Sequence, residues 1–395
     1  MKKSYLMIAA IAALFAACSE NDTYKEAVQE QQAPQALSFS AYADKVVKGS
    51  NSSALNDFYD AFSVWGFKKV TRTVNNVDED ADEPVFSNDP VEYFANDEAG
   101  NPVYVGSKPS SEWFKQASDF TAGWYYENVR FWDKLSKSYE FFAVAPYVES
   151  GDYTVAAGDA NVKIKSAETP YVISSEKNLA IENSVPKAKT LSYAGFNKDY
   201  MVATKITRTK TNNTLPTEKV DFVFKHILAK LNVKIKLGDS YIGKQELVVN
   251  DLKIANLAEK GYYVGNTDLT GWTITNDRYN RDILADYSLT ANTNYSDYYW
   301  LETLMFPQTA TCKKTEVQST SDGMTDMYLY IHYHIGNENY EAYYDFASIW
   351  MATPAVDGTF SFTQGNEYNL TITLGPEPIK FDASVTIWDT TNEDI

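Results

Sequence analysis

The strongest constraint on the fold is a strict alternation of apolar and polar side chains along several segments. In residues 231–237, leucine, valine and isoleucine take every second position, and asparagine and lysine take the positions between them. Residues 368–374 and 381–387 repeat the pattern. Successive side chains of a strand point to opposite faces, so a period of two predicts strands with one buried face.

Other segments have the same composition. Further strand candidates lie at 36–42, 62–67, 139–147, 200–207, 246–254 and 327–335. Phe360 and Phe362 are expected to enter a hairpin turn at Gly365-Asn366. Short helices are expected only at 57–61 and 277–285. Strands that polar loops separate, with no regular helices between them, predict an all-β chain of antiparallel sandwiches.

A polar run at 210–219 separates two apolar segments and gives the expected domain boundary. The N-terminal β-sandwich domain should then span residues 36–208, and the C-terminal β-sandwich domain residues 209–395. About 360 residues are enough for two domains of ordinary size.

The first 17 residues have the pattern of an export signal. Lys2 and Lys3 precede an apolar run at 5–17, which ends in Ala16 and Ala17 before Cys18. This run is shorter than the roughly 20 residues of a membrane span. A cysteine directly after small residues is the lipobox arrangement. We therefore expect residues 1–17 to be a removed signal peptide and Cys18 to carry the lipid that anchors the chain.

Residues 18–35 are polar and should form a lipidated flexible tether. The formal net charge of −18 argues against nucleic acid as a partner and against docking on anionic lipid through a basic patch. The chain has two cysteines. With Cys18 lipidated, Cys312 has no intramolecular disulfide partner.

Two groups of residues resemble metal sites but lack essential ligands. Asp78, Asp80 and Asp82 begin like a calcium-binding loop, but Glu83 stands where the sharp turn needs glycine, so a solvated acidic loop is expected. His332 and His334 share a strand face with two tyrosines. No third ligand is evident nearby, so a polar strand face is expected there and no metal.

Nothing in the sequence points to catalysis or to a cofactor. Cys312 has no neighbouring histidine, and His226 lies between apolar residues as a structural histidine does. There is no phosphate-binding glycine loop, no GxSxG and no HExxH. The expectation is a protein that is not an enzyme.

Five phrases in order resemble the fimbrillins, the pilins of Bacteroidales. They are the first strand Ala-Leu-Ser-Phe-Ser-Ala-Tyr (36–42), Tyr-Glu-Phe-Phe-Ala-Val-Ala-Pro-Tyr (139–147) after Phe131-Trp132, Asp-Tyr-Met-Val-Ala-Thr (199–204), Phe-Lys-His-Ile-Leu-Ala-Lys-Leu-Asn-Val (224–233), and the closing segment 365–374 with Val-Thr-Ile-Trp (385–388). The resemblance implies two transthyretin-like antiparallel β-sandwich domains in tandem. It also implies a surface-exposed lipoprotein of the outer membrane that loses its first strand to a protease and joins other pilin subunits by strand exchange in a fimbrium.

The expected cut falls between residues 43 and 60. The best-known maturation in this family follows arginine, but no arginine precedes Arg72 here, and the loop offers only Lys45 and Lys48. These two lysines are the candidate cleavage sites. An uncut subunit that kept its lipid would be an anchor, so stalk, tip and anchor roles all stay open, as does the receptor.

The alternative is a surface glycan-binding lipoprotein of a polysaccharide-uptake system. Such proteins share the lipidated tether and the sandwich build, and they use exposed aromatic side chains as sugar platforms. The candidate platform residues are Trp113, Trp124, Tyr125, Tyr126, Tyr299 and Trp300.

Overall fold

The computed structural model describes part of the chain, all of it beyond the expected signal peptide. The described residues are 35–43, 53–55, 59–100, 102–104, 122–147, 153–159, 163–167, 172–177, 199–212, 214–238, 247–258, 261–264, 271–274, 278–289, 291–292, 295–296, 298–313, 326–351, 358–375 and 378–387. Contacts divide the chain into Met1–Gln35 and Ala36–Ile395, and every described strand lies in the second unit. No helix within the described ranges is long and apolar enough to cross a membrane.

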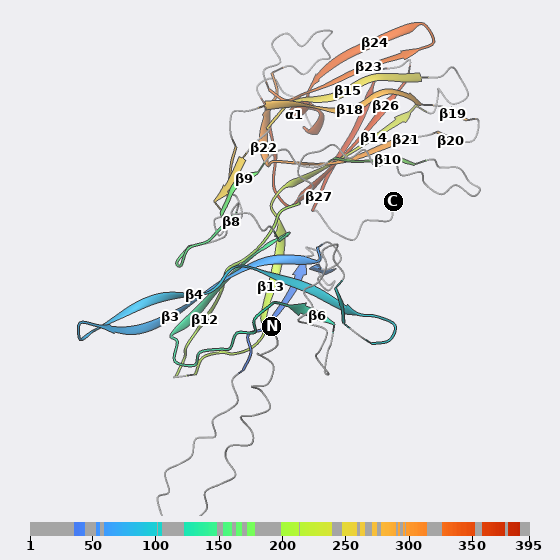
Figure 1. Ribbon diagram of the computed structural model, residues 1–395. Helices are drawn as coiled ribbons and strands as arrows, with labels where there is room; N and C mark the ends of the chain where they lie inside the picture. The colour runs from blue at the N-terminus through green and yellow to red at the C-terminus, as the bar shows by residue number, and fades with distance from the viewer. Residues whose placement is uncertain are drawn as a thin grey trace, which may run out of the picture. The chain divides into compact units, whose positions relative to one another are not determined.

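The largest sheet is built from strands of the first 226 residues (Figure 1). In spatial order its strands are β2 (Ser53–Ala54), β1 (Phe39–Ala43), β13 (Val220–His226), β11 (Met201–Ala203), β7 (Ser138–Ala145), β3 (Ala61–Val74), β4 (Val77–Asn96) and β5 (Pro102–Tyr104), with β12 (Ile206–Thr209) beside β7 and β6 (Gly123–Tyr125) beside β4. Asn75 and Asn76 both have positive φ, as a tight two-residue hairpin turn requires, and they join β3 to β4.

Two further sheets enclose a second core. One has the order β10 (Val172–Lys177), β21 (Tyr298–Met305), β14 (Ala229–Leu237), β26 (Asn366–Leu374) and β27 (Lys380–Ile387). The other has the order β18 (Arg278–Leu289), β15 (Leu247–Ala258), β23 (Tyr328–Ile335) and β24 (Glu338–Asp345). The apolar residues of 231–237 and 368–374 are buried between them, as the alternation predicts.

Smaller elements complete the structure. A second four-stranded sheet has the order β17 (Trp272–Ile274), β16 (Gly261–Val264), β9 (Lys163–Ala167) and β8 (Tyr153–Thr154). The short pairs are β19 (Ala291–Asn292) with β20 (Tyr295–Ser296), and β22 (Gln308–Thr311) with β25 (Thr359–Phe362). The helix α1 spans Phe346–Trp350 and packs into the second core.

The chain is all-β, as the sequence predicts, and three local expectations are wrong. Residues 278–289 form strand β18 and not a helix, because β15 supplies a ladder along their length. In the described part of the other expected helix, Ala61 already begins β3. Gly365 forms a turn with φ of 68°, but no hairpin closes there, because β25 pairs with β22 while β26 pairs with β14 and β27.

Two strand pairs are parallel, whereas the sequence predicts antiparallel sandwiches. β1 runs parallel to β13, and β14 runs parallel to β26. All other strand pairs between described residues are antiparallel. The proposed division at 208/209 and the transthyretin-like detail stay predictions.

Candidate assembly site at strand β1

Strand β1 is the first strand of the described chain and lies between two neighbours, β13 and β2, that pair with it over very different lengths. On one side it pairs over its whole length with β13, from Phe39 opposite Val220 to Ala43 opposite Phe224. On the other side only two residues pair with β2. The five-residue ladder with β13 therefore supplies most of the backbone pairing of β1.

The inner face of this segment is fully buried. Leu37, Phe39, Ala41 and Ala43 each have at most 3 % of their surface exposed. Their alternation with serine and tyrosine is the reason, because every second side chain of a strand faces the core. Removing the strand would therefore leave a groove lined by apolar side chains.

Phe39 fills the centre of this groove. Four rings surround it at centroid distances of 5.3 to 6.1 Å, those of Phe86, Tyr126, Phe222 and Phe141. Edge-to-face and stacked ring pairs add to the free energy of burying the ring. The pocket is thus shaped for one phenylalanine side chain.

Polar groups fix the start of the strand. Leu37 N–H donates to the carbonyl of Arg130 (2.8 Å), and the Tyr126 hydroxyl donates to the carbonyl of Leu37 (2.8 Å). Burial raises the pKa of Tyr126 above its ordinary value, so the phenol keeps the proton that it donates. Further along, the Ser40 hydroxyl donates to the Asp221 carboxylate.

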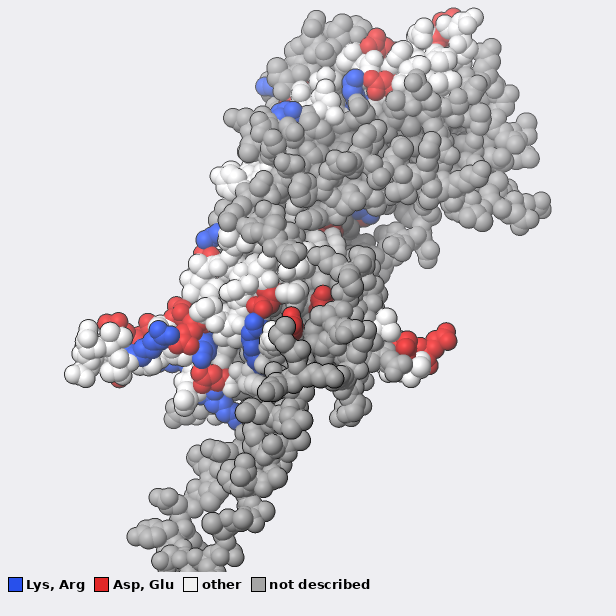
Figure 2. All heavy atoms as spheres, in the orientation of Figure 1, with Lys and Arg blue, Asp and Glu red and all other residues white. Residues whose placement is uncertain are grey.

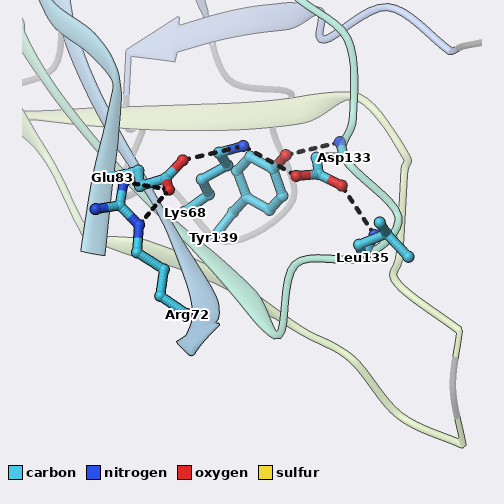
Figure 3. Close-up of polar contacts among 6 residues, drawn as sticks. All are labelled: Lys68, Arg72, Glu83, Asp133, Leu135 and Tyr139. Atoms are coloured by element: carbon cyan, nitrogen blue, oxygen red, sulfur yellow. Dashed lines mark hydrogen bonds and ion pairs between the residues drawn. The ribbon is translucent and has the colours of Figure 1, made fainter. Parts of the chain in front are cut away.

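The loop that receives the start of β1, residues 126–137, is here called the rim loop. Asp133 organises it (Figure 3). Its carboxylate accepts hydrogen bonds from Lys68 Nζ (2.9 Å) and from the backbone N–H of Leu135 (2.9 Å), and its own N–H donates to the Tyr139 hydroxyl (2.7 Å). Burial alone would raise the pKa of Asp133, but these hydrogen bonds lower it below its ordinary value.

Lys68 links the rim loop to the β3–β4 ribbon. Its ammonium also lies 3.3 Å from a carboxylate oxygen of Glu83, which in turn binds Arg72 at 2.6 Å. The hydrogen bond to Asp133, together with Glu83, raises the pKa of Lys68. Sequence analysis missed this network, because its members are far apart in the chain; only the neighbouring Phe131-Trp132 stood out.

The predicted modification sites lie outside the described residues. These are the lipidation site Cys18 and the cleavage sites Lys45 and Lys48. The ends of the loop with the two lysines are described: Ala43 closes β1, and Leu55 follows β2 with its side chain fully buried. A cut in this loop would separate β1 from β2, while Leu55 would still hold β2 in the core.

Strand β27 contrasts with β1. It is an edge strand that pairs only with β26 among the described strands. None of its side chains is buried; Phe381 and Ala383 are half-buried, and Val385 and Ile387 are about half exposed. If β27 left its sheet, the eight-residue ladder with β26 and the packing of Phe381 on Tyr344 would be lost, but no fully buried side chain would be exposed.

The acidic run 78–83 is a strand and not the loop that the sequence suggested. Asp78, Asp80 and Asp82 lie on β4 opposite threonine and lysine residues of β3. Asp80 also forms an ion pair with Lys137 at 2.5 Å. Figure 2 shows cationic and acidic side chains side by side on the projecting ribbon, which explains how so many carboxylates are tolerated there.

The histidines have structural partners. His226 Nδ1 lies 2.6 Å from the Asp199 carboxylate, and His334 Nδ1 lies 2.9 Å from the Asn250 side-chain oxygen. His332 and His334 do share one face of β23. The described residues contain no group of three or more His, Cys, Asp or Glu side chains placed to hold a metal ion. Cys312 is fully buried in the second core.

Two of the candidate sugar-platform residues are core residues. Trp124 and Tyr126 pack in the same cluster as Phe39 and are at most 9 % exposed. Tyr125 is half-buried on β6. The side chains of Trp113, Tyr299 and Trp300 lie outside the described part of the chain.

Comparison with known proteins gives one match to a family. The sequence model of the family described as fimbrillin-like matches residues 71–388. No curated protein matches the chain.

Similar solved structures include a fimbrial protein from Bacteroides vulgatus, with 14 % identity and a TM-score of 0.44 over 90 % of this chain and 100 % of that one. The tip fimbrial protein Mfa3 from Porphyromonas gingivalis, with C-terminal truncation, has 12 % identity and a TM-score of 0.38 over 90 % of this chain and 100 % of that one.

Proposed function

The chain belongs to the fimbrillin-like family, whose model matches most of its length, and we propose that it is a fimbrial subunit that joins its neighbours by strand exchange. Family membership supports a structural subunit of a cell-surface fimbrium that contributes to adhesion, in contact with other fimbrial subunits. The family is one of structural proteins and not of enzymes.

The proposal rests on the way β1 is held: its backbone pairs over its full length only with β13, and its apolar side chains fill one groove. Its loss would expose a groove centred on the Phe39 pocket and would leave the edge of β13 unpaired. An exposed edge of this kind is a template for a strand from another chain. A donor strand restores both the backbone ladder and the apolar contacts.

The energetics allow β1 to be separable. Burying Leu37 and Phe39 contributes about 1.5–3 kcal/mol each. The core behind them keeps its own contacts, because Phe86, Phe141 and Phe222 also pack within the same cluster. Removal of β1 should therefore weaken the sheet without unfolding it.

The proposed lipidation and proteolytic cut rest on the sequence alone. We propose that the precursor is a surface-exposed outer-membrane lipoprotein anchored through lipid on Cys18. A trypsin-like protease that cuts after Lys45 or Lys48 would free β1 and release the subunit for assembly. A copy that stays uncut would keep its lipid and serve as the anchor.

Limited trypsin digestion tests the proposal. The enzyme should cut at Lys45 or Lys48 first, and the trimmed protein should form oligomers in size-exclusion chromatography with light scattering. Deleting residues 379–395, the proposed donor segment, should abolish oligomer formation. Trimmed wild-type protein that stays monomeric at high concentration would refute strand exchange.

A gentler variant covers the case in which the deletion unfolds the C-terminal sheets. Val385→Asp alters a half-exposed side chain of β27 and should leave the fold intact while it blocks insertion into an apolar groove. Thr386→Asp, at the exposed neighbouring position, is the control and should assemble as wild type does.

A further inference from the structure

The last described strand repeats the side-chain pattern of the first. Residues 37–43 read Leu-Ser-Phe-Ser-Ala-Tyr-Ala, and residues 379–385 read Ile-Lys-Phe-Asp-Ala-Ser-Val. The first, third, fifth and seventh positions are apolar in both, with phenylalanine third and alanine fifth. Since alternate side chains share a face, each segment presents an apolar face of closely similar shape.

The two segments are held very differently. Every apolar side chain of 37–43 on the inner face is buried, whereas those of β27 are half-buried or exposed. Resting on the strand exchange proposed above, we propose that residues 379–385 of one copy replace residues 37–43 of the next, in the same direction and with Phe381 in the pocket of Phe39.

This register fits the groove better than registers shifted by one or two residues do. It places isoleucine where Leu37 packs and phenylalanine where four rings surround Phe39. A shift of two residues toward the C-terminus would put Ala383 in the Phe39 pocket and leave a large cavity, which close-packed interiors tolerate poorly. A shift of one residue would turn the apolar face outward.

One position fits poorly, and it makes the register testable. Asp382 takes the place of Ser40, whose hydroxyl donates to Asp221. Two carboxylates directly opposite each other on neighbouring strands repel. Ser384 takes the place of Tyr42, which is exposed, so a charge there is harmless.

The direction of insertion also fixes where the supplying subunit lies. Ile379 follows Leu374, the end of β26, by five positions in the chain. Five positions span at most about 18 Å. Because residue 379 would lie where Leu37 does, next to Arg130, the body of the supplying subunit must approach the rim loop.

The rim loop has the surface of a docking site. Val129, Phe131 and Leu135 are 57 %, 49 % and 87 % exposed, and Leu135 is the most exposed large apolar side chain of the described residues. The hydrogen bond from the Leu135 backbone N–H to Asp133, which also binds Lys68, holds the loop backbone at this position (Figure 3). A loop whose backbone is already held in place loses less conformational entropy on binding than a free loop does. We therefore assign the rim loop as the contact for the supplying subunit.

The register is tested on the trypsin-trimmed full-length protein by its rate of oligomer formation. Asp382→Ser should accelerate assembly by up to about fivefold through the removal of one like-charge pair. Ser384→Asp should leave the rate unchanged. In the disulfide test, Asp221→Cys with Asp382→Cys should give cross-linked oligomers under mild oxidation, and Asp221→Cys with Ser384→Cys should not.

The rim loop is tested in the same assay. Leu135→Asp should slow assembly at least tenfold, and Val103→Asp should not, because Val103 is a similarly exposed apolar residue on β5, at the other end of the sheet from β1.

The outcomes separate the three proposals. If trimmed wild-type protein assembles but the variant pair with Ser384→Cys is the one that cross-links, the register is overturned. Unchanged assembly of Leu135→Asp overturns the docking surface. In both cases strand exchange stands, whereas no assembly of trimmed wild-type protein overturns strand exchange and the register together.

Discussion

Replacing Phe39 by alanine should loosen β1 without loosening the sheet behind it. The side chain is 1 % exposed and lies within 6.1 Å of four aromatic rings, measured between centroids. Truncation of a buried phenylalanine to alanine costs about 3–5 kcal/mol, because the transfer free energy is lost and a cavity remains. The free energy of opening β1 should fall by that amount.

Hydrogen exchange of the β1 amides measures this opening. At about 1.4 kcal/mol for each factor of ten, the loss of about 3–5 kcal/mol corresponds to exchange that is roughly 100- to 4,000-fold faster. In the wild type, β1 amides should already exchange faster than those of β7, since β1 can open while the core of the sheet stays closed. The comparison is made peptide by peptide with mass spectrometry.

Phe142→Ala is the matched control. Phe142 is fully buried on β7 of the same sheet, but it belongs to a different cluster from Phe39. This variant should lower the free energy of global unfolding by a similar amount and leave β1 exchange unchanged. If Phe142→Ala accelerated β1 exchange as much as Phe39→Ala does, β1 would open only together with the whole sheet. The proposal that β1 can be replaced while the sheet stays folded would then be wrong.

Other expectations follow from the same contacts. Cys18→Ala should release the protein from membranes; a variant retained there without lipid would refute lipidation. Tyr126→Phe removes the hydrogen bond to Leu37 and should destabilise β1 by about 1 kcal/mol, measured as faster exchange. Asp133→Asn should lower stability by about 1–3 kcal/mol in urea unfolding. Because the folded-state pKa of Asp133 is depressed, its contribution is present above its unfolded pKa of about 3.9 and is lost as the pH falls further, so wild type and Asp133→Asn should converge below that value. Titration calorimetry against a panel of polysaccharides should give no micromolar binding; such binding in an aromatic cleft would favour the glycan-binding alternative.

The amino-acid sequence determined most of the strands and several of their buried faces. The alternation in 381–387 correctly predicts a strand, but the buried face that it also predicts is half-buried or exposed in the structure. Alternation in 231–237 and 368–374 predicted which side chains are buried, and the structure confirms them. The inner face of the first strand followed from the same rule. This works because the direction of a side chain along a strand depends on the local backbone alone.

The sequence did not determine which strands pair with one another. Phe360 and Phe362 were expected to pair with 366–374 across a tight turn, but β25, the strand that contains them, pairs with β22. Residues 278–289 carry no clear period of two, and only the ladder offered by β15 makes them a strand. The parallel pairing of β1 with β13, and the arrival of Arg130 and Tyr126 at its start, join segments about 90 to 180 residues apart.

The difference has a physical cause. Periodicity is a property of residues that are close in the sequence. The hydrophobic effect is non-directional, so it favours burial of an apolar face against any apolar surface and does not select one partner. Pairing and register depend on where distant segments return, on the loops that allow it and on the competition among strands for the same edge. The apolar face of residues 37–43 could therefore be seen in the sequence, while the pocket around Phe39 and the exposed side chain of Leu135 exist only in the folded chain.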